Sequence, residues 1–254
     1  MGTVRWYVLG GAVLAMFVQS PSGVSTALPA APVTVPHSDY FNYPLPTWEP
    51  NCLGFGSQWR LCNGTVLRAC SSGAVWLHEI KHDGFRVIAR KAGERVKLYS
   101  RPGNDLTWRF PLIVEALARL RSRSCIIDGE AVACGEDGIA SFDRIRYRRH
   151  DAEVFMWAFD LIELNGDLRR DPLNVRKATL ASVLARAAPG LRLNEHLEAD
   201  GPDVFHHACM LGLEGIASKR KDSQYRSGPS PHWIKSKNPK ALAVKREAEE
   251  DWGR

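Results

Sequence analysis

The chain has 254 residues, 44% of them hydrophobic and 24% charged, a composition that excludes disorder throughout and is typical of one substantial folded domain with additional segments. The formal net charge of +6 favours an anionic partner such as nucleic acid or a nucleotide, but it is too modest to prove one. Three arginines face two acids in the first 74 residues, so nearly all of the excess charge belongs to the rest of the chain.

Residues 1–27 have the organisation of a secretory signal peptide. Arg5 precedes the apolar run WYVLGGAVLAMFV, and Ser25 and Ala27 are small residues at the spacing of a cleavage site. The run has 13 residues, which is short for a bilayer core of about 30 Å, so no stable membrane insertion is expected. The alternative is a start codon assigned too early, which adds foreign sequence in front of the protein.

Residues 28–74 are expected to form a linker or a small irregular module, because they are rich in proline, glycine, serine and cysteine and follow no helical or strand period. No cysteine stands in a CxxC pair, so a zinc site is not expected. The six cysteines are Cys52, Cys62, Cys70, Cys125, Cys134 and Cys209. Disulfides among the first three require export of the chain.

From residue 75 the chain consists of short apolar runs separated by turn residues, with longer runs of helical periodicity between them. The expected strands cover 74–80, 85–91, 95–101, 124–134, 153–164, 191–197, 214–220 and 232–238, and the expected helices cover 108–122, 174–188 and 202–212. Strands 85–91 and 95–101 are predicted to form a hairpin, and Asn174 to be a helix N-cap. Since strand pairs come before and between helices without strict alternation, the pattern indicates an α+β fold with antiparallel sheets.

Charged residues stand at the ends of several expected strands, where a sheet presents a site. In the stretch IKHDGFR, Lys81 ends an apolar strand and is followed by Asp83 and Gly84, which form a natural turn between two strands. Taken alone, such a lysine is a surface charge. The other strand-end residues are Arg101, Glu130, Glu214, Lys235 and Lys237.

Two pairs among these residues suit nucleotide chemistry. Lys235 and Lys237 are two positions apart, so on a strand they share one face and can hold one phosphate chain between two ammonium groups. Glu130 and Glu214 supply hard oxygen ligands for Mg²⁺, which binds few carboxylates together with substrate phosphates.

Six stretches carry these residues in one order between Trp76 and about Pro239: IKHDGFR, SRPGND, DGE, FDLIELNG, EGIASKR and WIKSK. The ordered set resembles the ATP-dependent DNA ligases, covalent nucleotidyltransferases related to RNA ligases and messenger-RNA capping enzymes, and is most similar to the ligase module of bacterial end-joining ligases. The resemblance implies a nucleotidyltransferase (ATP-grasp-like) adenylation domain over residues 75–240, with antiparallel sheets flanked by helices. Residues 241–254 are then a charged tail, too short for the C-terminal oligonucleotide-binding (OB) barrel with which such ligases continue.

The resemblance also implies roles for individual residues. Lys81 matches the lysine that attacks the α-phosphate of ATP and becomes adenylated, and Arg86 matches the arginine near the ribose and phosphate. Glu79 falls where the family contacts the adenine edge, and Arg101 matches an arginine that binds nucleotide or the nicked strand. For both arginines the alternative is a surface cation. Phe159 matches the aromatic that stacks on adenine, although the alternation of aromatics around it is equally typical of core packing.

The remaining assignments concern the metal and the phosphates. Glu130 matches an acidic residue near the ribose and metal, and Glu214 matches the metal-associated glutamate, so Mg²⁺ or Mn²⁺ is expected beside them. The alternative for both is a solvated strand-end charge. Lys235 and Lys237 match the lysines that hold the α-phosphate.

The activity implied by the resemblance is that of a DNA ligase in repair or recombination: Lys81 takes AMP from ATP, the AMP passes to a 5′-phosphate at a nick in double-stranded DNA, and the 3′-hydroxyl seals the strand. The alternatives are an RNA ligase or capping-type guanylyltransferase, and a non-catalytic exported or truncated remnant that binds nucleotide or nucleic acid. A ligase is expected in the cytoplasm with its ATP and DNA, and a separate OB-fold or end-joining protein is an expected partner. The run DRIRYRRH, residues 143–150, either contacts the DNA backbone or forms a solvated helix face.

Overall fold

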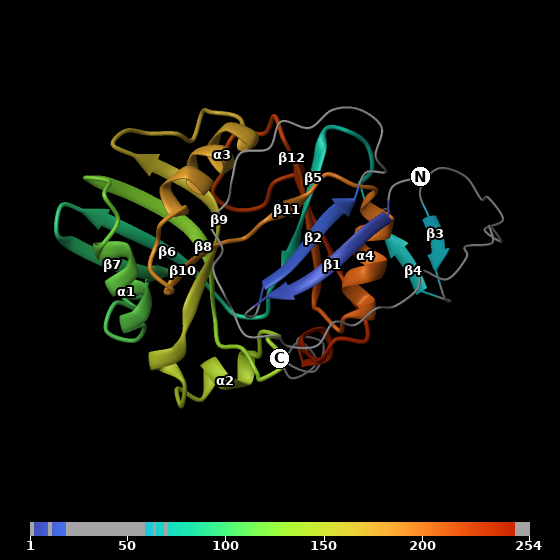
Figure 1. The fold of residues 1–254 in the computed structure, drawn as a ribbon, viewed down its shortest axis with the longest axis horizontal. Helices are drawn as coiled ribbons and strands as arrows, with labels where there is room; N and C mark the ends of the chain where they lie inside the picture. The colour runs from blue at the N-terminus through green and yellow to red at the C-terminus, as the bar shows by residue number, and fades with distance from the viewer. Residues whose placement is uncertain (1–2, 10–11, 19–58, 63–64, 69–70, 247–254) are drawn as a thin grey trace. The chain divides into compact units, whose positions relative to one another are not determined.

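The computed structural model describes residues 3–9, 12–18, 59–62, 65–68 and 71–246 (Figure 1). The chain divides into two compact units, Met1–Gly54 and Phe55–Arg254. In the first unit, β1 (Thr3–Leu9) pairs with β2 (Ala12–Val18) in an antiparallel hairpin. The expected signal-peptide cleavage site lies outside the described residues, as does most of the segment expected as a linker.

The second unit holds two larger sheets and a short hairpin. The five-stranded sheet has the order β10 (Leu191–Leu193), β9 (Phe155–Leu164), β8 (Ser124–Val132), β6 (Phe85–Ala92) and β7 (Arg95–Ser100). The four-stranded sheet has the order β11 (His196–Leu197), β5 (Trp76–Lys81), β12 (Gly215–Arg220) and β13 (Trp233–Lys237). The hairpin consists of β3 (Trp59–Cys62) and β4 (Thr65–Arg68). Neighbours within the two sheets are antiparallel except β10 and β9, which are parallel.

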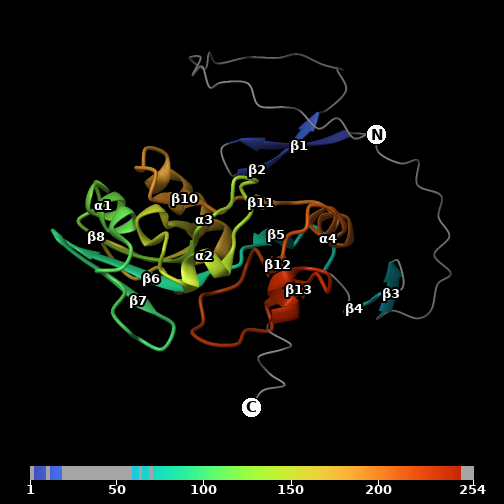
Figure 2. The same ribbon diagram turned by 90° about the horizontal axis from the view of Figure 1, so that it is seen from below.

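The labelled α-helices are α1 (Pro111–Ala118), α2 (Phe142–Arg146), α3 (Leu173–Leu184) and α4 (Gly201–Met210). The described residues 242–246 are also helical. A short 3-10 helix occupies Asp151–Glu153. Helices α1 and α3 lie beside the five-stranded sheet, and α4 beside the four-stranded sheet (Figure 2). The expected α+β architecture with antiparallel sheets and flanking helices is confirmed.

Each sheet has its own hydrophobic core. In the larger core, Ile113 and Leu117 of α1 and Leu180 of α3 pack against buried strand residues such as Val87 and Ile127. The smaller core is formed by α4 and β12. Since side chains alternate along a strand, burial of one face of the four-stranded sheet under α4 leaves its other face for a site.

The turn after Lys81 does not close a hairpin. It carries the chain from β5 in the four-stranded sheet to β6 in the five-stranded sheet, so the strands on either side have no shared hydrogen bonds. A Cβ atom at Gly84 would overlap the carbonyl oxygen of Ala131 at the end of β8. This close approach explains the glycine at the crossover, because only glycine leaves room for the neighbouring backbone.

The start of helix α3 differs from the expectation. Asn174 was expected as an N-cap, but α3 begins at Leu173 after Pro172. The Asn174 side chain accepts a hydrogen bond from Val175, and its main-chain N–H donates to the carbonyl of Lys221. The start of α3 is therefore held by a long-range contact that the sequence did not reveal. Within the described part of the chain, every helix is too short or too polar to cross a membrane.

Candidate functional site

The strand register gathers the predicted charged residues on one face of the four-stranded sheet. Lys81 on β5 pairs with Gly215 on β12, and Gly215 pairs with Lys237 on β13. One step along, Glu79 pairs with Ala217, and Ala217 pairs with Lys235. Positions directly across a sheet point the same way, so both lysines of β13 lie on the face of Lys81. Lys235 and Lys237 are exposed.

The amine of Lys81 forms an ion pair with Glu214, which directly precedes β12. The carboxylate is buried, with 3% of the Glu214 side chain exposed, whereas the Lys81 side chain is 19% exposed. Gly215 next to it has φ +146, and a Cβ there would overlap the carbonyl of Ser236. The strand therefore starts with a residue that lets β13 approach closely, which sets the position of Glu214 beside the amine.

The five-stranded sheet supplies Arg86 and Glu130 from β6 and β8, where the two residues are directly paired. Arg86 donates to both oxygens of the buried Asp128, at 3.0 and 2.6 Å, and the hydroxyl of Tyr225 donates to the same carboxylate at 2.9 Å. Asp128 thus fixes the guanidinium of Arg86 at the boundary between the sheets. This anchoring residue was not among the expected site residues.

The charges of the two sheets act on each other. Burial and the negative charge of Glu214 together raise the pKa of Glu130 to about 8, against the opposing effects of Lys81, Lys235 and Arg86. Although the Lys235 residue is exposed, desolvation of its amine lowers its pKa, and the positive charges of Lys81, Arg86 and Arg101 add to that lowering. Six of the predicted residues therefore form one electrostatic cluster: Lys81, Arg86, Arg101, Glu130, Glu214 and Lys235.

Phe159 lies at the boundary between the sheets and is only half-buried, unlike the buried aromatics next to it on β9. Its ring makes an edge contact with Trp233, with 6.3 Å between centroids. The amine of Lys219 lies 4.3 Å from the centroid of Phe159 and 4.2 Å from that of Trp233. The guanidinium of Arg86 lies 5.7 Å from the centroid of Phe159. An aromatic ring placed here can stack on a planar base.

Glu79 is buried beneath this aromatic pair. Its two carboxylate oxygens accept hydrogen bonds from Lys177 at 2.5 Å and Lys219 at 2.6 Å. The two lysines lower the pKa of Glu79 despite its burial, which acts in the opposite direction. Both carboxylate oxygens of Glu79 are thus engaged by lysines of this chain.

Lys177 could not have been recognised from the sequence. It belongs to α3, and the pattern of that helix marks no inward lysine, yet the side chain is 2% exposed. Its amine also donates to the carbonyl of Asn194 at 2.9 Å. The partner of Glu79 is thus 98 positions away in sequence, and only the packed structure reveals it.

The residues around the turn are also fixed. The ring of His82 stacks on Trp157, with 4.9 Å between centroids, and hydrogen-bonds to Asn194 at 3.1 Å. Burial lowers the pKa of His82 to about 4, so the imidazole is neutral at pH 7. Asp83 accepts a hydrogen bond from the N–H of Phe142 at 3.3 Å and pairs with Arg246 at 2.7 Å.

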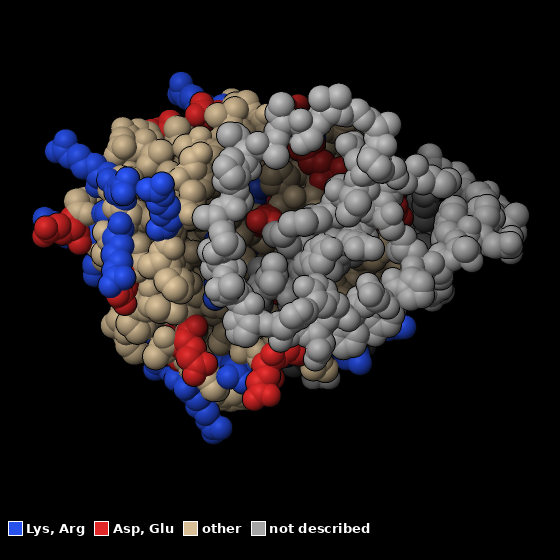
Figure 3. Space-filling model, viewed as in Figure 1, with Lys and Arg blue, Asp and Glu red and all other residues tan. Residues whose placement is uncertain are grey.

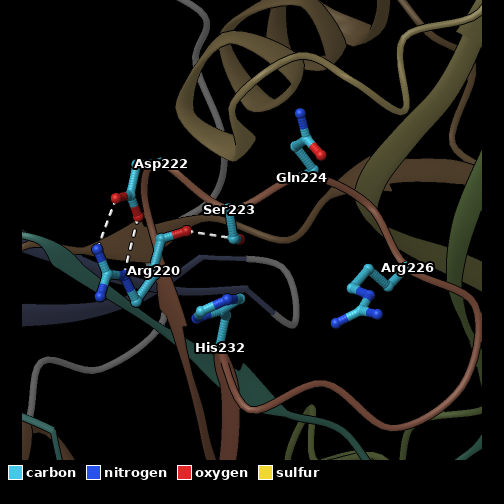
Figure 4. A pocket seen from close by; sticks show the side chains of 6 residues that line it. All are labelled: Arg220, Asp222, Ser223, Gln224, Arg226 and His232. Carbon is cyan, nitrogen blue, oxygen red and sulfur yellow. Dashed lines mark hydrogen bonds and ion pairs between the residues drawn. The ribbon is translucent and has the colours of Figure 1, made fainter.

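A separate hollow of about 470 Å³ lies at the far end of β12 (Figure 4). Arg220 and Asp222 at its edge are joined by two hydrogen bonds, at 2.9 and 2.6 Å. The other lining residues are Ser223, Gln224, Arg226 and His232. None of the residues of the Lys81 cluster lines this hollow.

Comparison with known proteins gives a consistent set of relatives. The model of the ATP dependent DNA ligase domain matches residues 62–237. The multifunctional non-homologous end joining protein LigD of Mycolicibacterium smegmatis is 34% identical over 165 residues, and that of Pseudomonas aeruginosa is 38% identical over 167 residues; each alignment covers 64% of this chain. The chain spans 21% and 20% of the length of these two relatives.

Solved structures agree with the sequence relatives. The structure of a mycobacterial DNA ligase D complexed with ATP and MES is similar with a TM-score of 0.57 and 32% identity, over 66% of this chain and 58% of that one. The ligase domain from M. tuberculosis LigD gives the same values.

Proposed function

The chain belongs to the ATP-dependent DNA ligase domain family, and from this premise we propose that it transfers AMP from ATP to Lys81 and then to a 5′-phosphate at a break in double-stranded DNA, in repair or recombination. One observation carries the proposal. The amine of Lys81 contacts Glu214, on the sheet face that also carries Lys235 and Lys237, and its charge acts on Glu130 of the other sheet. A lysine that only stabilised the surface would need one partner and none of the surrounding cations.

The first step forms a bond between the Nζ atom of Lys81 and the α-phosphorus of ATP, and the bond from that phosphorus to the pyrophosphate oxygen breaks. The amine loses a proton and pyrophosphate leaves. Lys235 and Lys237 stabilise the negative charge that builds on the phosphate oxygens, and Arg86, held by Asp128, orients the nucleotide. Phe159 stacks on the adenine base, next to Trp233.

Two carboxylates suit a magnesium ion. Glu130 and Glu214 come from different sheets, and the negative charge of Glu214 raises the pKa of Glu130, as expected for two carboxylates that share a small region. Among the described residues there is no cluster of three acidic, histidine or cysteine ligands, which fits Mg²⁺ because this ion takes one or two carboxylates and completes its shell with phosphates and water. When bound, it supplies positive charge at the phosphates.

The second and third steps join the DNA strand. The 5′-phosphate oxygen of the DNA attacks the phosphorus of the lysine-bound AMP, the N–P bond breaks, and Lys81 is regenerated. The neighbouring 3′-hydroxyl then attacks the activated 5′-phosphate, and AMP leaves with the formation of the phosphodiester bond. Positive charge around Lys81 favours the approach of DNA phosphates, so binding weakens as salt is added.

Lysine labelling tests this proposal. The purified chain is incubated with Mg²⁺ and ATP labelled in the α-phosphate, denatured, and examined for label on the protein. We expect label on the wild type and on Lys97→Ala, which removes an exposed lysine, but none on Lys81→Ala. Label from GTP alone would redirect the assignment to a capping-type guanylyltransferase, and no label from either nucleotide would indicate a remnant that only binds.

A second assay addresses the DNA steps by themselves. Nicked duplexes that already carry AMP on the 5′-phosphate are supplied without ATP, and sealed strands are separated on a denaturing gel. We expect sealing by the wild type. A chain that takes label from ATP but leaves pre-adenylated nicks open would retain only the first step of the proposal.

A further inference from the structure

An exposed aromatic and basic surface flanks α2, and we call it the Trp108 patch: Trp108, Tyr147, Arg148 and Arg149. Trp108 is 69% exposed and Tyr147 is 65% exposed, and they are the only aromatic side chains among the large apolar residues that the described part of the chain exposes. Arg148 and Arg149 are also exposed. Aromatic rings of this kind are common where a partner covers them.

The patch is organised in the free protein. The guanidinium of Arg148 lies over the ring of Trp108, 4.5 Å from its centroid. Arg148 has φ +60, a left-handed conformation that residues with a side chain rarely adopt. Asp151 also pairs with Arg148, at 3.8 Å. One face of the Trp108 ring is thus covered, and the exposure of 69% leaves the other face open.

A buried arginine supports this arrangement. Arg109, with 10% of its side chain exposed, donates to both oxygens of Asp151 at 3.2 and 3.1 Å and also to the carbonyl of Ile145. Its guanidinium lies over Phe85 and Phe110, at 5.2 and 5.1 Å from the ring centroids. Because Arg109 joins the segment before α1 to the end of α2, Trp108 and Arg148 are held together without a ligand.

The charge around the patch is positive. The segment from 143 to 153 contains four arginines against three acids. Arg144 and Arg148 face acidic neighbours at 3.8 Å, while Arg149 makes no ion pair or hydrogen bond with any other described residue. In Figure 3, both Lys or Arg and Asp or Glu side chains stand at the lower edge of the molecule, where Figure 1 shows α2. The small excess of positive charge favours an anionic partner, such as a polyanion, over a cationic one.

Side-chain and main-chain contacts connect the patch to the turn that follows Lys81. Phe142, the first residue of α2, donates its N–H to Asp83 and packs against Phe85 with 4.9 Å between ring centroids. Helix α2 has five residues and is therefore roughly 8 Å long. A series of contacts thus links the turn after Lys81, through Phe142 and α2, to Arg148 and Trp108.

We propose that the Trp108 patch binds the unpaired nucleotides of a DNA end beside the break that is to be joined. A base stacks on the open face of Trp108, opposite Arg148, and Arg149 binds a phosphate of the same strand. Base pairs inside a duplex cannot fill this site in the same way, because they are stacked on both faces and offer only their edges and phosphates. The inference rests on the proposed function, since it takes DNA as the substrate.

Equilibrium binding without ATP tests the proposal. Fluorescence anisotropy compares a blunt duplex with the same duplex carrying an unpaired extension of several nucleotides. We expect the wild type to prefer the extended duplex, and Trp108→Ala to lose at least about fivefold in affinity for it while its affinity for the blunt duplex stays unchanged. Trp108→Phe keeps a ring and should keep most of the preference.

Two further variants separate stacking from general charge. Arg149→Ala, in which the replaced side chain has no partner among the described residues, should weaken the extended duplex more than the blunt one. Arg95→Ala removes an exposed arginine of β7 and is the matched control, expected to bind both duplexes like the wild type. Equal losses on both duplexes would reduce the patch to a nonspecific basic surface and overturn the proposal, as would an unchanged preference in Trp108→Ala.

Failure of the proposed ligase activity and failure of the Trp108 patch give different experimental results. Lysine labelling needs no DNA, so each variant is first checked for label from ATP, for its circular dichroism spectrum and for its melting temperature. Absence of label on the wild type, with the preference for extended DNA intact, contradicts the ligase activity alone. Normal label with no difference between the two duplexes contradicts the patch alone. If Trp108→Ala fails to fold, Arg149→Ala and Trp108→Phe carry the decision.

Discussion

Replacement of Arg176 by leucine tests whether the buried ion pair behind the aromatic pair is essential for the fold. Arg176 and Asp160 are fully buried and joined by two hydrogen bonds, at 2.7 and 2.9 Å. The guanidinium also donates to the carbonyls of Asp171 and Ser223. It thereby links α3, β9 and the segment after β12, next to Phe159.

The magnitude follows from what Arg176→Leu leaves behind. Removal of one partner of a buried pair costs about 3–5 kcal/mol, because the remaining carboxylate stays without its countercharge. The two carbonyls that also lose their donor place the cost in the middle of that range or above, at about 4 kcal/mol. A domain of ordinary stability, about 5–15 kcal/mol, would lose a large share of its free energy of unfolding.

The chain offers a matched control. Arg169 and Asp167 form a pair of the same geometry, with hydrogen bonds of 3.0 and 2.8 Å, but their side chains are 58% and 52% exposed. Arg169→Leu should hardly change the stability, because water and salt screen an exposed pair. The comparison keeps the chemical groups and the two side-chain hydrogen bonds of the pair the same, and it varies burial together with the two carbonyl contacts that Arg176 makes in addition.

Urea unfolding followed by tryptophan fluorescence measures the difference. With a slope of roughly 2 kcal/mol per molar urea, Arg176→Leu should lower the midpoint by about 2 M. The double variant Asp160→Asn with Arg176→Leu should recover at least about 1 kcal/mol of this loss, since it carries no unpaired charge. Equal midpoints for Arg176→Leu and Arg169→Leu would refute the reasoning.

Three further predictions concern the neighbourhood of the nucleophile. The pKa of His82 is lowered from 6.5 to about 4 by burial, so the unfolded chain binds a proton that the folded chain refuses, and stability should fall as pH decreases from about 6.5 to 4, by at most about 3 kcal/mol. In His82→Gln this dependence should be reduced, whereas the exposed-site control His206→Gln should keep it; urea midpoints at pH 7.5 and 4.5 decide. Gly84→Ala forces a Cβ atom onto the carbonyl of Ala131 and should cost about 2 kcal/mol, visible in calorimetry as a lower melting temperature, and an unchanged value would show that the crossover can relax. Lys235→Ala should slow labelling of the protein by ATP at least about tenfold at an unchanged melting temperature, and normal labelling would remove this lysine from the phosphate site.

Local patterns in the sequence predicted most of the fold. The alternation in FRVIARK and RVKLYSR predicted β6 and β7 and their hairpin, because a half-buried strand pair leaves a period of two in its own residues. The same reasoning did not reveal that β5 and β6 belong to different sheets. A turn motif shows that the chain changes direction, whereas the partner of each strand is set by residues far away in sequence.

The candidate site divides in the same way. Lys81, Glu214 and the lysines of β13 stand in recognisable motifs, and the register confirms that the lysines of β5 and β13 share one sheet face. Lys177 and Arg176, in contrast, are adjacent positions of α3 that both point inward to acids on different strands. Long charged side chains in a helix are usually solvated, so nothing in the local pattern marks these two as buried partners.

The strand order of the four-stranded sheet has a consequence for folding during synthesis. The strand that ends in Lys81 is among the first of its unit to be synthesised, but its neighbour β12 begins only at Gly215 and the edge strand ends at Lys237. Four of the five strands of the other sheet lie between residues 85 and 164 and can pair while synthesis continues. Contacts of such high sequence separation form late in folding. During synthesis the strand that ends in Lys81 therefore waits for its long partner β12 until Gly215–Arg220 have been added.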